Sequence, residues 1–506
     1  MNRRRFLLDW WPLRSTLPSS YAPIRTGRYP SHPGVGSGKV RLVSGTLVAE
    51  NEPVTRMANR RVPIHLPMGA VLLFCASAAV AVVGAVAGPH ALPLMPGRTY
   101  DFFDLNIYRE SVRAVLDGRD LYSATFQRGF GFTYPPAATL LFMWLAAAPM
   151  HVCEVVVTII NLALVLLIGH LAVRLRTGSA VAATRRGRGV AGSAAPWIAA
   201  SLALWTEPVI TTIGYGQVNI LIAVLVLLDL TVLRDRGYGG VGIGIAAGLK
   251  LTPLVFVPYL IGSGRVRDAG RAAATFGGSI VLSAVVEPWN ARAYWLGAVF
   301  DTSRVTGGHD RFSGRGPMNQ SLHGMLMRSV PAVGLSKVGT FACCALVGAA
   351  GLWLASRAAR RGDDVAGFTL TAISGLLICP VSWTHHWVIA LPGLLLLVAV
   401  PERSVRGALA CVAALLAAVA SSLFPLELIS NPHGAHGDIA SLVFGSAYVW
   451  AGLATIAVAA ARELLQVRPG QRNWGGRRTS SPYDSGAAIS GDPTGGVAAW
   501  RRQSAV

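Results

Sequence analysis

Long apolar runs separated by short polar segments recur along the chain from about residue 68 to residue 462. A helix needs about 20 apolar residues to cross a bilayer, and a bundle of such helices satisfies its backbone hydrogen bonds without water. The pattern therefore predicts an all-α polytopic membrane protein. The clearest spanning candidates are residues 68–88, 154–173, 195–213, 217–233, 270–287, 337–356, 365–381, 384–400, 406–424 and 441–462.

Two further apolar stretches do not fit a simple span. Residues 137–150 are too few to cross a bilayer, and residues 241–262 are interrupted by Lys250 and Pro253. A full span at 137–150 would place the arginines of 174–188 outside, against the usual excess of Lys and Arg in cytoplasmic loops. We therefore predict a re-entrant or surface helix at 137–150 and a helical hairpin at 241–262 that returns to its own side. With these re-entrant segments and amphipathic helices in the outer loops, about 10–13 membrane helices are expected.

The composition of the chain agrees with a membrane protein. Hydrophobic residues make up 52% of the 506 residues and charged residues only 14%, against about 25% charged residues in soluble domains. The formal net charge of +21 comes largely from arginines in the tails and in the loops predicted to be cytoplasmic, which indicates membrane topology and not nucleic-acid binding. We predict disordered cytoplasmic tails at 1–66 and 465–506 around a transmembrane domain at 67–464. The six cysteines form no C-x-x-C pair, so neither a disulfide framework nor a zinc site is indicated.

Polar clusters with possible chemistry fall mostly on the predicted outer face. They are 99–136, 214–219, 250–253, 288–334, 382–387 and 425–440. Convergence of such clusters on one face of a membrane bundle predicts an active site that faces outward, because a purely structural bundle does not need it.

The first outer loop contains two candidate bases, Asp101 and Asp104, beside apolar neighbours. A carboxylate at a membrane interface can act as a general base, although the loop has as many arginines as acids and also fits a solvated amphipathic segment. Tyr134 precedes two prolines at a predicted helix start. Gln217 and Asn219 lie in a tight turn and can hydrogen-bond a hydroxylated ligand.

Cationic residues suggest a phosphate ligand. Lys250 interrupts an apolar segment, where an ionisable residue is costly and favours a functional role, although a lysine that snorkels to the interface also fits. Arg311 and Arg315 belong to a basic outer loop, and guanidinium groups suit phosphate recognition; a flexible basic loop is the alternative. Asn319 and Gln320 follow in the same loop.

The adjacent pair His385 and His386 suggests a metal at first sight. Neighbouring residues on a helix point about 100° apart, however, so both rarely bind one ion. We interpret one histidine as a phosphate or sugar contact and the other as a packing residue, and we predict no metal.

Several of these segments occur together, in order, in one known family. They are Asp104-Leu105-Asn106-Ile107-Tyr108, Tyr134-Pro135-Pro136, Gly216-Gln217-Val218-Asn219, Gly248-Leu249-Lys250-Leu251-Thr252-Pro253, Asn319-Gln320-Ser321 and Ser382-Trp383-Thr384-His385-His386-Trp387. The ordered set resembles the actinobacterial polyprenol-phosphate-mannose-dependent α-(1→2)-mannosyltransferases of the GT-C superfamily, glycosyltransferase family 87. The resemblance covers roughly residues 66–464, and the long basic N-terminal extension is atypical of the family.

The resemblance implies a GT-C membrane fold whose catalytic aspartate is Asp104; Asp101 has no counterpart in the family pattern. It implies a polyprenyl-phosphate-mannose donor, whose prenyl chain an apolar groove would hold. The acceptor would be a mannosylated glycolipid of the phosphatidylinositol mannoside, lipomannan or lipoarabinomannan type, on the outer face of the plasma membrane. The expected donor-phosphate contacts are Lys250, His385, His386, Arg311 and Arg315. The expected sugar or acceptor contacts are Asp101, Tyr134, Gln217, Asn219, Asn319 and Gln320.

Two alternatives remain open at this point. One is another lipid-linked-sugar transferase, such as a decaprenyl-phospho-arabinose-dependent arabinosyltransferase. The other is a transporter of lipid-linked sugars, although transport favours polar residues along a path through the bundle, and here they gather on one face. Because fixed cations can stabilise a leaving monophosphate, we expect no cofactor and no metal requirement.

Overall fold

The computed structural model describes residues 40–43, 46–49, 67–87, 101–182, 194–305, 314, 316–333, 336–393 and 445–467. The chain divides into two units, residues 1–63 and 64–506. In the first unit, β1 (Val40–Val43) and β2 (Thr46–Ala49) pair antiparallel, with Val40 opposite Ala49. Most of both predicted tails, the predicted span 406–424 and the polar segment 425–440 lie outside the described residues.

The second unit contains several long apolar helices. Within its described residues, four are long and apolar enough to cross a membrane: Met150–Gly178 of α4 (Met150–Ala182), α11 (Val266–Val286), α14 (Lys337–Arg360) and Ala447–Leu464 of α19 (Ala447–Val467). Two further helices would make a fifth span if they are counted as one. They are α7 (Glu207–Tyr215) and α8 (Asn219–Leu228) with its π-helical end η4 (Asp229–Leu233), and the chain bends by 116° between α7 and α8. The chain is therefore a multi-pass α-helical membrane protein, as predicted.

Most predicted spans correspond to a helix, but two differ. The first span is α1 (Met68–Ala87), and the predicted span 365–381 is α15 (Asp364–Ile378). The predicted span 195–213 is broken into α6 (Ala195–Leu204) and α7, because Pro208 lacks the N–H that would donate to the Leu204 carbonyl and instead stands in the first turn of a new helix. The predicted span 384–400 begins as the 3₁₀ helix η9 (Thr384–Ile389).

The interrupted segment 241–262 is a helical hairpin, as predicted. Helix α9 (Val241–Leu249) ends at Lys250, which is extended, and the chain returns through η5 (Thr252–Val255) and α10 (Phe256–Gly262). Both ends of the hairpin meet α11 at Asp268, since Gly240 packs against its backbone and Arg265 forms an ion pair of 3.1 Å with its carboxylate. Lys250 therefore lies at the tip of the hairpin.

The other short apolar stretch also fits its prediction. It forms α3 (Ala137–Phe142) and the 3₁₀ helix η3 (Met143–Ala146), which together are too short to cross a membrane. Before it, α2 (Phe103–Leu116) buries Leu105, Tyr108 and Val112 and exposes Leu116. These elements form a cap of short amphipathic helices.

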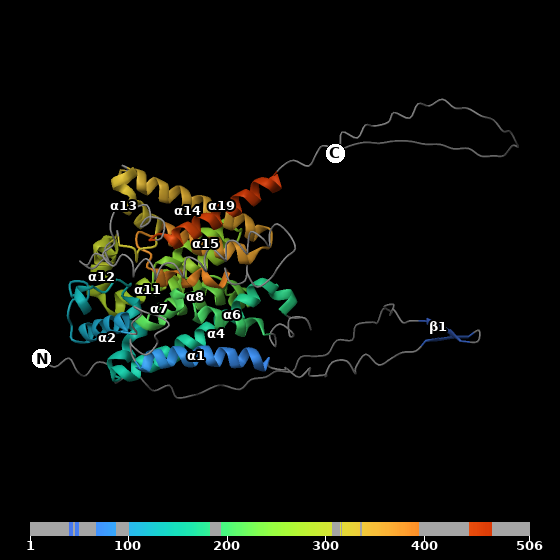
Figure 1. Ribbon diagram of the computed structural model, residues 1–506, viewed down its shortest axis with the longest axis horizontal. Helices are drawn as coiled ribbons and strands as arrows, with labels where there is room; N and C mark the ends of the chain where they lie inside the picture. The colour runs from blue at the N-terminus through green and yellow to red at the C-terminus, as the bar shows by residue number, and fades with distance from the viewer. Residues whose placement is uncertain are drawn as a thin grey trace, which may run out of the picture. The chain divides into compact units, whose positions relative to one another are not determined.

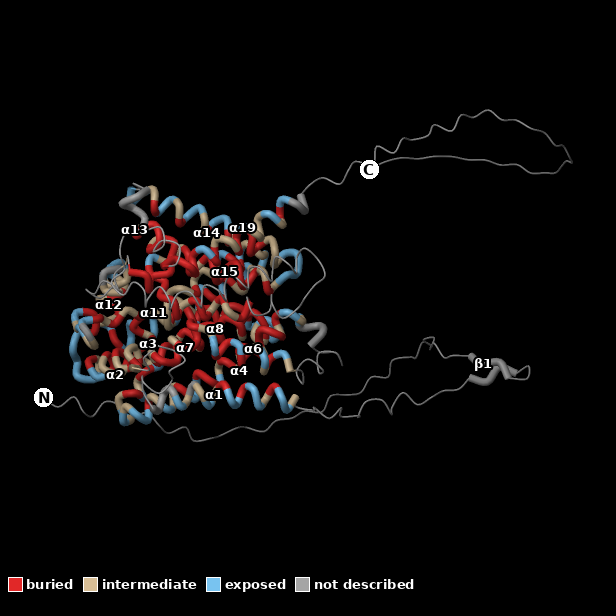
Figure 2. Tube along the Cα trace, viewed as in Figure 1, coloured by how far each residue is buried: buried red, intermediate tan, exposed pale blue. Residues whose placement is uncertain are grey.

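The two ends of the helical unit differ in chemistry. Ion pairs join helices at one end, among them Arg174–Asp235 (2.8 Å), Arg234–Asp364 (2.7 Å) and Arg361–Glu463 (2.6 Å). The short helices α2, α12 (Pro288–Leu296) and α13 (Leu322–Val333) lie at the opposite end (Figure 1). The buried residues run through the middle of the bundle (Figure 2), whereas Val285 on α11 and Phe341 on α14 are exposed apolar side chains, as expected for helices that face lipid.

Candidate active site

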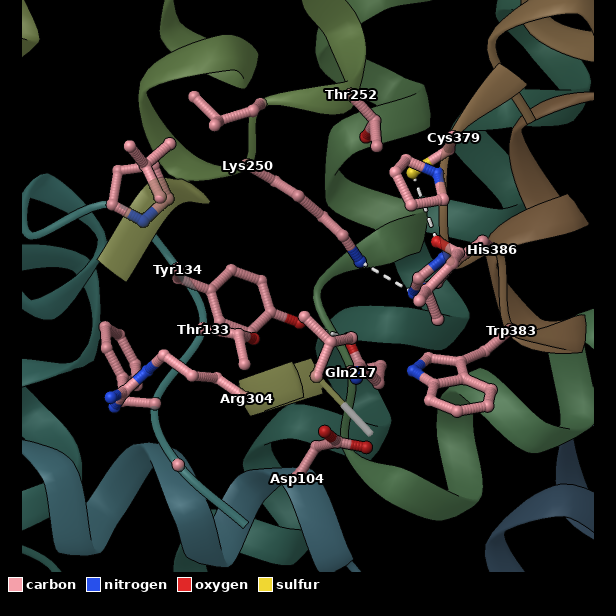
Figure 3. Close-up of a pocket in the computed structure, with 18 of the residues that line it drawn as sticks. Asp104, Thr133, Tyr134, Gln217, Lys250, Thr252, Arg304, Cys379, Trp383 and His386 are labelled. Atoms are coloured by element: carbon pink, nitrogen blue, oxygen red, sulfur yellow. Dashed lines mark hydrogen bonds between the residues drawn. The ribbon is translucent and has the colours of Figure 1, made fainter. Parts of the chain in front are cut away.

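A cavity of about 660 Å³ opens among the cap, the hairpin tip and the ends of α7 and α15. It brings together residues from segments far apart in the sequence. Of the predicted site residues, Asp104, Tyr134, Gln217, Lys250, His385 and His386 line it. Figure 3 shows Lys250 reaching toward His386, with Asp104 below them on α2. Asn219 lines a smaller cavity that shares Lys250 and His386 with the larger one.

The position of Asp104 depends on how α2 begins. Phe102 precedes the helix with φ 46°, and its N–H donates to the Gly214 carbonyl at 2.9 Å. Gly216, at φ +66°, lies so close to α2 that a Cβ there would be 2.7 Å from Leu105 Cβ. Only glycine tolerates both this φ and this contact. The first turn of α2 is therefore held against the turn between α7 and α8, which puts Asp104 beside Gln217.

The surroundings of Asp104 suit a general base. Burial raises the pKa of its carboxyl to about 7, while a hydrogen bond from Gln217 and the charge of Lys250 act in the opposite direction. Asp101 adds a small upward contribution to the same pKa, but it does not line the cavity, and its carboxylate accepts from the Phe103 N–H. A base whose pKa lies near neutrality can accept a proton and still be largely ionised at physiological pH.

Lys250 is held by two neighbours. Its Nζ lies 2.8 Å from Asn219 Oδ1 and 3.0 Å from His386 Nε2, and Asn219 Nδ2 donates to the His385 carbonyl at 3.4 Å. Because an ammonium group only donates, His386 Nε2 accepts and the proton of its neutral ring lies on Nδ1. Lysine and histidine thus form one polar unit at the hairpin tip.

Both histidines keep hydrogen-bonding capacity for a ligand. Among the described residues, His386 Nδ1 and both ring nitrogens of His385 are buried and have no partner. Buried polar nitrogens are normally paired, so these atoms are suited to oxygen atoms of a bound molecule. The His385 ring also packs against Tyr215, with the ring centroids 5.5 Å apart.

The predicted arginines Arg311 and Arg315 lie outside the described residues. Earlier in the same loop, Arg304 lines the cavity, with its guanidinium 5.8 Å from the centre of the Tyr122 ring. Its loop was recognised as basic, but nothing in the sequence singled this arginine out. Arg328, in contrast, is buried and donates to the carbonyls of Gly316 and Asn319.

Asn319 and Gln320 do not line the cavity. The Asn319 amide donates to the Gly314 and Pro380 carbonyls and accepts from the Ser321 and Ser382 N–H groups. The Gln320 amide donates to the carbonyls of Pro317 and Gly445. The Asn319 side chain therefore holds the segment before α13 against the segment that carries the histidines, and the Gln320 side chain ties it to the start of α19.

A buried carboxylate that was not among the predicted site residues supports the site. Glu207 accepts from Thr384 at 2.9 Å and from the Tyr448 hydroxyl at 2.7 Å, and so ties α7 to η9 and α19. Its signal was an acidic residue inside an apolar run, a pattern that marks either a function or a structural network. Among the described residues, no three His, Cys, Asp or Glu side chains come together as a metal site.

Comparison with known proteins adds independent evidence. Residues 132–382 match the profile of glycosyltransferase family 87. A Mycobacterium tuberculosis protein named polyprenol-phosphate-mannose-dependent alpha-(1-2)-phosphatidylinositol mannoside mannosyltransferase is 31% identical over 389 residues, which cover 74% of this chain and 88% of the relative. Its namesake from Mycolicibacterium smegmatis is 29% identical, with coverages of 72% and 84%. A Mycobacterium tuberculosis phosphatidylinositol pentamannoside mannosyltransferase is 28% identical, with coverages of 61% and 69%.

Proposed function

The chain belongs to glycosyltransferase family 87, and from this premise we propose that it transfers mannose from polyprenyl-phosphate-mannose to a mannan-type glycolipid in α-(1→2) linkage. The acceptor would be a phosphatidylinositol mannoside or a lipomannan or lipoarabinomannan precursor. One observation carries the proposal. The cavity holds a carboxyl poised as a base and, across from it, a lysine–histidine unit suited to a phosphate.

The reaction would be a single displacement with inversion. Asp104 takes the proton of an acceptor 2-hydroxyl while that oxygen attacks the anomeric carbon of a β-linked mannosyl phosphate. The new C–O bond forms as the bond between the anomeric carbon and the phosphate oxygen breaks. The product is an α-mannoside, and the polyprenyl phosphate leaves with the bonding electron pair.

Fixed cations would stabilise the leaving phosphate as it gains charge. Lys250 supplies one such cation, with the neutral His386 ring as its hydrogen-bond partner, and Arg304 brings a guanidinium into the same cavity. Arg311 and Arg315 remain candidates in the loop that follows. These cations would do what Mg²⁺ does for nucleotide-sugar donors, so we expect transfer without a metal.

The donor's prenyl chain needs an apolar path that begins at the phosphate. The cavity lining supplies apolar side chains for it, among them Leu254, Val255 and Pro258 of the hairpin, Leu352 of α14 and Ile378 of α15. Lys250 lines the same cavity. The arrangement supports a substrate with a charged head and a long apolar tail.

We further propose that the site faces the outside of the plasma membrane and that both termini are cytoplasmic. The arginines of the ion pairs Arg174–Asp235, Arg234–Asp364 and Arg361–Glu463 lie at the end opposite the cavity. Positive-inside topology assigns that end to the cytoplasm. A membrane-impermeant thiol reagent should label a cysteine introduced at Asp117 in intact cells; labelling only after lysis would contradict the orientation.

Membranes that contain the protein and labelled donor test the transfer itself. Wild-type protein should move mannose from polyprenyl-phosphate-mannose, and not arabinose from decaprenyl-phospho-arabinose, to a phosphatidylinositol mannoside. Asp104→Asn should lose at least about 10³-fold in kcat, because the amide cannot accept the proton, while the protein stays folded and membrane-bound. Asp117→Asn, on the exposed end of α2, is the matched control. Near-normal transfer by Asp104→Asn would remove Asp104 from the role of base.

A further inference from the structure

Three polar side chains meet behind the Asp104 carboxyl. The hydroxyls of Tyr108 and Tyr134 lie 2.7 Å apart, and each lies 2.8 Å from Gln217 Oε1. Both tyrosines are buried, and their rings pack edge to face with centroids 5.3 Å apart. Gln217 and the Asp104 carboxyl line the same cavity, and the Gln217 amide lowers the pKa of that carboxyl, as a hydrogen-bond donor beside it does. The group therefore links α2, the segment before α3 and the turn between α7 and α8.

Counting protons limits how this group can be hydrogen-bonded. Two hydroxyls have two protons for three short oxygen–oxygen contacts, so one contact cannot be a full hydrogen bond. In one consistent order, the Tyr108 hydroxyl donates to the Tyr134 oxygen, and the Tyr134 hydroxyl donates to Gln217 Oε1. This order uses each proton once. It leaves Gln217 Nε2 facing Asp104, where an N–H and not a carbonyl oxygen suits an ionised carboxylate.

We propose that Tyr108, Tyr134 and Gln217 form a directional hydrogen-bond relay that positions Asp104 as the base. The inference rests on the proposed function, since it assigns the relay to the same transfer. The tyrosines act through Gln217: their hydroxyls fix the amide, and the fixed amide N–H fixes one carboxylate oxygen. The other oxygen of Asp104 stays free to face the acceptor hydroxyl. Tyr134 and Gln217 are thus positioning residues and do more than line a sugar site.

The relay also affects the pH range in which the base is ionised. A hydrogen bond donated to the ionised carboxylate lowers its pKa, so loss of that bond raises the pKa. The titratable and charged groups that face Asp104 are Lys250 at the hairpin tip, Asp101 before α2, Tyr108 and Tyr134. The substitution Tyr134→Phe leaves the charges of Lys250 and Asp101 in place. The acidic limb of the pH–rate profile should therefore move to higher pH.

Tyr134→Phe and Tyr108→Phe should lower kcat by about 10- to 100-fold, because a misplaced base costs rate more than binding, with little change in the acceptor KM. For Tyr134→Phe the acidic limb should move up by about half to one pH unit. A double variant that combines Tyr134→Phe with Gln217→Ala should be no slower than Gln217→Ala alone. The effects of the two substitutions are not additive, because the tyrosine acts through Gln217.

Tyr122→Phe is the matched control. Its hydroxyl donates a buried 2.8 Å hydrogen bond to the Tyr134 carbonyl but does not touch Gln217, so its pH profile should equal that of the wild type. The relay would be overturned if Tyr134→Phe kept the acidic limb of the wild-type pH–rate profile, or if it raised only the acceptor KM. It would also be overturned if the losses of kcat in Tyr134→Phe and Gln217→Ala multiplied in the double variant. Wild-type protein that transferred no mannose would instead refute the proposed function.

Discussion

The substitution Lys250→Met tests the donor-phosphate site most directly, because the side chain keeps most of its length and loses its charged amino group. Lys250 Nζ lies within hydrogen-bond distance of Asn219 and His386, at 2.8 and 3.0 Å. The leaving phosphate gains negative charge as its bond to the anomeric carbon breaks. A fixed cation in a site with little water stabilises this charge more in the transition state than in the bound donor.

The expected loss of kcat follows from this stronger stabilisation of the transition state. Removal of one fixed donor from such a site costs about 10²–10³ in kcat, or about 3–4 kcal/mol of transition-state stabilisation. The donor KM should rise much less, because the substitution leaves unchanged the apolar lining at Leu254 and Val255 that we propose for the prenyl chain. Methionine also leaves Asn219 and His386 without their shared partner, which costs about 1–3 kcal/mol of folding stability.

The assay measures initial rates against labelled donor for protein in lipid nanodiscs, with the unfolding temperature followed in parallel. Lys337→Met is the control, because Lys337 is exposed at the start of α14 and outside the cavity lining. A Lys250→Met protein that stays folded and keeps kcat within about twofold of the wild type would refute the reasoning and leave Lys250 with a structural role only.

Four further predictions can be tested with the same preparation. Transfer should increase with pH through about 7, the raised pKa of Asp104, because the base works only when ionised; a flat pH–rate profile between 6 and 8 would contradict this. Gly248→Ala should lower both kcat and the unfolding temperature, since its Cβ would lie 2.6 Å from Ser279 Oγ at a cost of about 1–3 kcal/mol, whereas Gly277→Ala, with open space at its Cβ, should not. Asn319→Ala should destabilise the protein by about 2–4 kcal/mol, because it leaves several buried backbone groups unpaired, as a thermal shift would show. EDTA should not change the rate, and a loss restored by Mg²⁺ would refute the metal-free mechanism.

Much of the architecture was predictable because it depends on local patterns. Apolar runs of sufficient length predict spans, and α1, α11 and α14 begin and end close to the predicted limits. A lysine followed by a proline inside an apolar run predicts a break, which the hairpin between α9 and α10 contains. The break between α6 and α7 was missed, because Pro208 lies in a run whose hydropathy alone fits one continuous helix.

The candidate site was predictable only as a set of residue types. Asp104, Lys250 and His386 each stand out as polar residues in apolar surroundings, and the cavity brings them together. Asn319 looks equally suited to a sugar ligand in the sequence, yet its amide is occupied by backbone partners. Arg304 looks like any arginine of a basic loop and nevertheless lines the cavity.

The sequence by itself thus determined the membrane class, the hairpin and the types of residue available for chemistry, because these depend on neighbours within a few turns. Only the tertiary structure decided which polar groups face a ligand and which are already paired. Tyr108 and Gln217 are 109 residues apart, and the 2.8 Å contact between the Tyr108 hydroxyl and Gln217 Oε1 exists because α2 packs on the turn between α7 and α8. Such a contact depends on the packing of several helices at once, and no local pattern contains it.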